Sequence, residues 1–222
     1  MSIHLEQSAP PPPGDLLRAH LARGGAKKPR RPLRDALVWS LGAAVVAIAM
    51  IAASGVRRDL VGVDPRWLGL GLAWALVAVA GAVAAMLPRA GQVLPSARRA
   101  RFIAAGSVVF LAFVTARFYY DSPLSTRYQG LSALHGIVHC GGLGVLMAAP
   151  LVGLAWALVI RRVPISAPII GAAFGAAAGA ASGVVLNTIC PVGGQLHALA
   201  GHVGVVVLGA LLGAASSVFN RR

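Results

Sequence analysis

Two short stretches of the sequence gather both cysteines and four of the six histidines, and each adjoins a long apolar run. The first stretch holds His135, His139 and Cys140; the second holds Cys190, His197 and His202. Thiolate and imidazole bind soft or borderline metal ions, and two thiols that face an oxidising compartment can form a disulfide. We therefore expect a redox or metal-responsive cluster, with Cys140 and Cys190 as the sensing pair and the four histidines as metal ligands or tuning groups.

Two other interpretations of these residues stay open. A free cysteine can act as a small apolar residue, and interfacial histidines are common. Histidines from two helices could also hold a porphyrin, although the Cys-x-x-Cys-His attachment motif is missing. Cys140 is also turned about a third of a circle from His135 at ~100° per residue, so not every group need converge.

The elements that must position these groups are membrane helices. The chain of 222 residues is 57% hydrophobic and only 12% charged, which is too apolar for a soluble domain. Its net charge of +14 comes from short basic clusters between apolar runs, so nucleic acid is not expected as a direct partner. The fold class is all-α: a polytopic membrane bundle of six transmembrane helices. Continuous, non-alternating runs favour helices over a barrel.

Each of the six apolar runs is near the ~20 residues that cross a bilayer as a helix. They extend over Ala36 to Ser54, Trp67 to Leu87, Phe102 to Phe118, Leu134 to Ile160, Ile169 to Ile189 and Leu196 to Phe219. Residues 1–35 form a tail and residues 36–220 the transmembrane domain. None of the six acidic residues is expected inside a span. Together with the missing Gly-x-Ser-x-Gly and His-Glu-x-x-His motifs, this argues against an enzyme.

Basic residues predict the orientation. The tail, the second and fourth connections and the C-terminus carry fifteen Lys and Arg, and the other three connections carry five. The positive-inside rule therefore puts both termini in the cytoplasm, and both cysteines and the four nearby histidines near the outer face.

Four glycines mark the fifth span as a packing helix. Gly171, Gly175, Gly179 and Gly183 recur at every fourth residue. A strip without side chains lets another helix approach closely, within the chain or in a homo-oligomer. We expect this span to be central to the bundle.

The tail contains one segment that could hold a partner. Asp15 can cap a short helix from Leu16 to Arg23 that ends at Gly24 and Gly25. Its apolar stripe is Leu16, Leu17 and Leu21. Two turns are marginal alone, so the segment is either a flexible leader to the membrane domain or a segment that folds on a partner.

The chain carries a set of short motifs: Cys140, Arg161-Arg162, the glycine ladder, Cys190-Pro191, the following histidine, Gly-Ala-Leu-Leu-Gly from Gly209 to Gly213, and the weaker Arg31-Pro-Leu-Arg34 and Arg57-Arg58-Asp59-Leu60. Together they resemble the motifs of the NrsF-type membrane anti-sigma factors, which are six-helix negative regulators of extracytoplasmic-function (ECF) sigma factors. The resemblance implies a protein of the bacterial inner membrane that holds an ECF sigma factor inactive and releases it on a stress signal sensed at the cysteine pair. In relatives the stimuli include heavy metals and, in a light-response regulator of carotenoid synthesis, singlet oxygen. The proline-rich tail and the extra histidines depart from the pattern. The alternative function is a small membrane protein that handles a metal or haem.

Overall fold

The computed structural model describes residues 31–56, 66–87, 96–120, 131–159, 167–190 and 194–218. These residues form helices and no strands. The sequence divides into two units, Met1–Arg31 and Pro32–Arg222, and the helices below belong to the second. The short helix predicted at Leu16 to Arg23, with its three leucines, lies outside the described residues.

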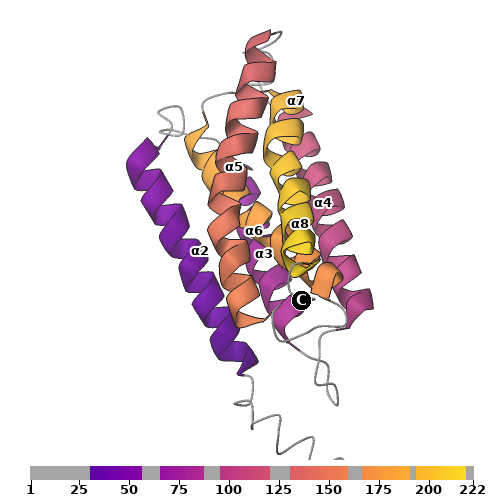
Figure 1. Cartoon of the computed structure of the whole chain (residues 1–222). Helices are drawn as coiled ribbons and strands as arrows, with labels where there is room; N and C mark the ends of the chain where they lie inside the picture. The colour runs from indigo at the N-terminus through magenta and orange to yellow at the C-terminus, as the bar shows by residue number, and fades with distance from the viewer. Residues whose placement is uncertain are drawn as a thin grey trace, which may run out of the picture. The chain divides into compact units, whose positions relative to one another are not determined.

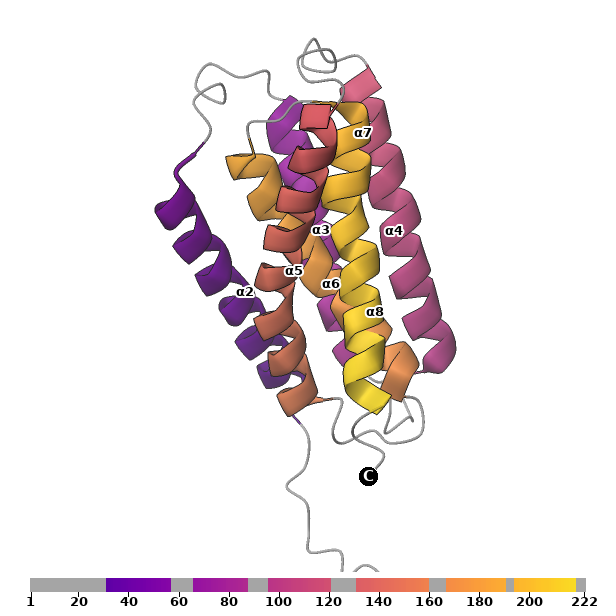
Figure 2. The same cartoon turned by 45° about the horizontal axis from the view of Figure 1, so that its top comes forward.

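Six helices are long and apolar enough to cross a membrane, which confirms the predicted fold class. They are α2 (Pro32–Ser54), α3 (Arg66–Met86), α4 (Ala97–Tyr120), α5 (Leu131–Leu158), α6 (Ala167–Ile189), and a last span built from α7 (Gln195–His197), the π-helix η4 (Ala198–Val203) and α8 (Gly204–Val218). Since the number of spans is even, the start of α2 and the end of α8 lie at one end of the bundle, opposite α7 (Figures 1 and 2).

Helix α6 lies at the centre of the bundle and contacts every other spanning helix (Figure 1). In its membrane-crossing window 78% of the residues are buried, against 11% for α2. The reason is its composition: alanine and glycine fill most of α6, so neighbouring helices can pack on all its faces.

The glycines of α6 and α8 bring the two backbones together. A Cβ on Gly171 would strike the carbonyl of Gly213, and a Cβ on Gly175 would strike the carbonyl of Gly209. Further along α6, a Cβ on Gly183 would overlap the ring of Trp74 on α3. These contacts fix how α6, α8 and α3 are rotated about their axes, and so which side chains meet at the end of the bundle.

Helix α2 is held at the edge by a few specific contacts. The indole Nε1–H of Trp39 donates a hydrogen bond to the carbonyl of Leu151 on α5 at 3.1 Å, and the ring is fully buried. Asp35 lies in the first turn of the same helix and is also fully buried. The prediction that no acidic residue would lie in a span was therefore wrong. The helix begins at Pro32, four residues before the predicted start, because proline is well suited to a first helical position.

Candidate functional site

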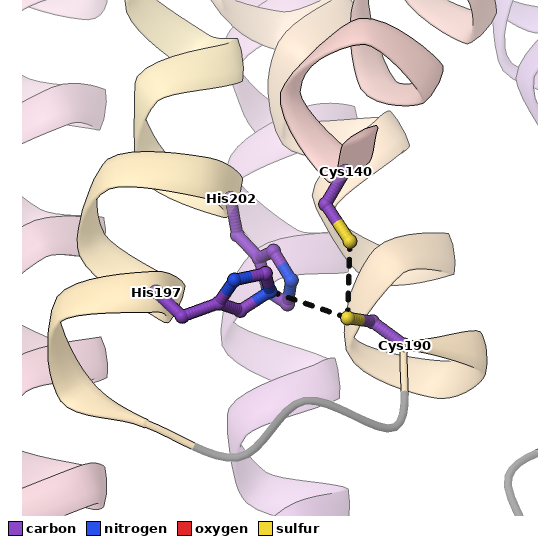
Figure 3. Close-up of side chains that lie close together, drawn as sticks. All are labelled: Cys140, Cys190, His197 and His202. Atoms are coloured by element: carbon purple, nitrogen blue, oxygen red, sulfur yellow. Dashed lines mark hydrogen bonds between the residues drawn. The ribbon is translucent and has the colours of Figure 1, made fainter. Parts of the chain in front are cut away.

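The two cysteines come from neighbouring helices. Cys140 lies in the first half of α5, and Cys190 directly follows α6, where its N–H donates to the carbonyl of Leu186 at 2.9 Å. The next residue in the sequence is Pro191, which cannot continue the ladder because it has no N–H. Their Sγ atoms are 3.0 Å apart, and both cysteines are free and buried (Figure 3).

The two histidines of the last span meet because the helix is locally wound as a π-helix. His197 and His202 are five residues apart, which in an α-helix would separate them by roughly 140° at ~100° per residue. Residues 198–203 instead form η4, and the N–H of Gly204 bonds to the carbonyl of Leu199, five residues back. An i to i+5 turn brings residues five apart onto one face. The two rings accordingly meet edge to face, with centroids 5.2 Å apart.

Four ligand atoms converge at this point. One atom each from Cys140, Cys190, His197 and His202 lies within 4.8 Å of all the others, and the Nε2 of His197 is 3.2 Å from the Sγ of Cys190 (Figure 3). All four side chains are at most 5% exposed. We call this group the Cys/His cluster. Around it lie the apolar side chains of Met147, Val185, Leu186 and Val205.

One histidine of the cluster is oriented by an amide. The Nδ1 of His202 is 2.9 Å from the Oδ1 of Asn187, and both side chains are buried. An amide oxygen only accepts, so this contact puts the ring proton on Nδ1 and leaves the lone pair on Nε2. Sequence reasoning gave Asn187 no role. The available signal was a polar amide in a mostly apolar span, four residues after Gly183.

The other two predicted histidines are not in the cluster. His135 and His139 share one face of α5, as their spacing predicts, and their rings stack in parallel with centroids 6.5 Å apart. Both are exposed, whereas Cys140 is buried. The cause is the helical rotation of ~100° per residue, which turns His139 away from its neighbour Cys140.

The cluster has the size of a site for a single ion. Two sulfurs and two imidazole nitrogens are a common set for a tetrahedral ion. A haem held by two histidines would need them on opposite faces of a wide ring. His197 and His202 instead come from one helical segment, in mutual contact and packed among apolar side chains. The cluster therefore fits an ion and does not fit a haem held between these two histidines.

Comparison with known families gives a match to NrsF, described as negative regulator of sigma F, over residues 21–220. The chain belongs to the NrsF family. The match covers nearly the whole chain, including all six spanning helices and the Cys/His cluster. No curated protein and no solved structure gives a match.

Membership in the NrsF family confirms the resemblance drawn from the sequence. It makes this chain a regulator whose partner is a sigma factor, and the six apolar helices make it a multi-pass membrane protein.

Proposed function

We propose that this NrsF protein is an anti-sigma factor of the bacterial inner membrane. In this proposal it holds an ECF sigma factor inactive at the cytoplasmic face, and a metal or oxidative stress sensed at the Cys/His cluster releases that factor. It has no enzymatic step. The observation that carries the sensing role is the convergence of two thiols and two imidazoles in a buried site.

The architecture provides a physical route between the two ends. The basic N-terminal region precedes α2, and α2 starts at the end of the bundle opposite the cluster (Figure 2). Helix α6 runs between the ends: it leads into Cys190 and packs on all the other spanning helices. A change at the cluster can shift sigma binding only if it differs in free energy between the holding and releasing states. Rotation or translation of α6 would change its contacts with every other spanning helix, so α6 is the element that we expect to transmit the change.

The partner-binding segment in this proposal is the tail helix with Leu16, Leu17 and Leu21. Burying one leucine contributes roughly 1.5 to 3 kcal/mol. Replacing Leu17 and Leu21 together by Asp should therefore weaken sigma binding by about a hundredfold or more. The measurement is a pull-down of the sigma factor with full-length protein in mild detergent. Deletion of Pro10 to Gly14 is the control, because it shortens the linker, keeps the leucines and should change binding little. Unchanged binding after removal of the whole tail would move the contact to the cytoplasmic loops.

The second candidate function is the handling of a metal ion, which the same four ligand atoms favour. The two functions predict different partners. A sigma factor that co-purifies in stoichiometric amount supports the regulator, whereas a transported ion without a sigma factor supports the alternative.

A further inference from the structure

The Cys/His cluster is buried among apolar side chains, so its total charge matters. Charges in a low-dielectric interior are costly unless they are balanced. A bound ion takes cysteine as thiolate and histidine as neutral imidazole, so this set carries two negative charges. We propose that Cys140, Cys190, His197 and His202 bind one Zn²⁺ ion. The two charges of Zn²⁺ make the loaded site neutral, whereas Cu⁺ would leave it with one negative charge.

The distances need only a small adjustment to hold this ion. Zn–S bonds of ~2.3 Å and Zn–N bonds of ~2.0 to 2.1 Å give a tetrahedron with edges of about 3.4 to 3.8 Å. The two sulfurs are 3.0 Å apart, and the Cys190 sulfur is 3.2 Å from the His197 nitrogen. No pair of ligand atoms is more than 4.8 Å apart. Side-chain movements of about 1 Å or less therefore reach the tetrahedral arrangement, with the ion between the four atoms.

Asn187 is a positioning residue for this site. Histidine ligands of metals commonly donate their second ring N–H to an oxygen, which sets the tautomer and the ring orientation. The contact of the His202 Nδ1 with the Asn187 Oδ1 is of this kind. It leaves the Nε2 of His202 with the lone pair that a metal requires.

The metal site names the ligand of the proposed sensor. Only the link between metal binding and signalling rests on the proposed function. Binding of Zn²⁺ displaces one proton from each thiol, so two protons leave per ion. The apparent affinity should therefore fall as the pH is lowered, because protons compete with the ion for the thiolates and imidazoles.

The test uses full-length protein purified in mild detergent with its thiols reduced. We expect one Zn²⁺ per chain by elemental analysis. Replacing Zn²⁺ by Co²⁺ should give the visible bands of a tetrahedral cobalt site and a thiolate-to-cobalt charge-transfer band in the near ultraviolet. Cys140→Ser, Cys190→Ser, His197→Gln and His202→Gln should each lose or shift these bands. Asn187→Leu should keep the tetrahedral bands and weaken binding by about 10- to 100-fold.

The matched controls are His135→Gln and His139→Gln, which change exposed histidines on the same helix as Cys140. Both should bind one ion like the wild type. If reduced wild-type protein takes up neither Zn²⁺ nor Co²⁺, if Cu⁺ is the ion bound, or if the control variants lose the ion, the proposal is overturned. Elution profiles in detergent identify variants that fail to fold. If some ligand variants do not fold, metal uptake by the wild type and the two control variants still tests whether the ion is bound. A sigma factor captured by metal-free protein would leave the anti-sigma function standing.

Discussion

Asp35 is a carboxylate buried in the first turn of α2, beside the exposed guanidinium of Arg34 at 3.6 Å. A negative side chain at a helix N-terminus interacts favourably with the unpaired N–H groups and the helix dipole. It also takes part in the packing at the start of α2, where Ala36 and Trp39 are buried as well. Asp35 therefore contributes to holding the most exposed spanning helix in place.

Replacement of Asp35 by Asn should test this contribution. The amide keeps the shape but loses the charge, so we expect a loss of about 0.3 to 2 kcal/mol of stability and a lower thermal midpoint in detergent. Leu33→Asn is the control, because Leu33 lies in the same turn and is 67% exposed. Equal midpoints for Asp35→Asn and the wild type would show that the charge contributes nothing.

The Cys/His cluster shows which residues of a site can be predicted from the sequence and which cannot. Cys140 and Cys190 stand out because the chain has only two cysteines, each at the end of an apolar run. The sequence placed all four histidines near these cysteines and did not distinguish the two that join the cluster from the two that do not. His202 joins it through a π-turn, and His139 is turned outward on its face of α5.

Helices α6 and α8 are held together by backbone contact, which is sensitive to a single methyl group. Gly175→Ala would place a Cβ against the carbonyl of Gly209. We expect it to cost about 1 to 3 kcal/mol through overpacking and to lower the thermal midpoint. Gly106→Ala on α4 is the control, since a Cβ there meets nothing within 4 Å. That variant should be neutral or up to about 1 kcal/mol more stable. If Gly175→Ala melts like the wild type, the close contact of the two helices is absent in solution.

The apolar runs predicted the spanning helices, but they did not predict where each helix begins and ends. Helix α4 begins at Ala97, five residues before the predicted start at Phe102, and so includes Arg98, Arg99 and Arg101. Arginine is a good helix former, and its long side chain can carry the charge to the interface while the stem stays at the helix surface. A run defined by hydropathy therefore stops before the helix does.

The molecule as a whole is predicted to keep both termini in the cytoplasm, because fifteen of the twenty Lys and Arg lie in the segments assigned to that side. A cytoplasmic reporter fused after Arg222 should therefore be active, and a periplasmic one inactive. Fusions in the connection after Ser54 should give the reverse pattern and serve as the control. An active periplasmic reporter at the C-terminus would put the Cys/His cluster at the opposite face.

The number of spans and the central place of α6 follow from composition, since both depend on runs and repeats along the chain. The depth of the cluster within the bundle depends on contacts between segments far apart in sequence, such as Cys140 with Cys190. Such contacts depend on how each helix is rotated about its own axis. The glycine strips set these rotations, and the rotation angles cannot be read from the sequence.

The π-turn has a consequence for insertions and deletions. Because η4 accommodates one residue more than an α-helical turn, removal of a residue between His197 and His202 would leave the pair four apart, on one face of a regular α-helix. Ala200 is exposed and lies within η4, so its deletion should restore the α-helix, keep both imidazoles at the thiols and leave the glycine contacts of α8 in register. A relative with this shorter spacing would carry the same centre in a straight helix.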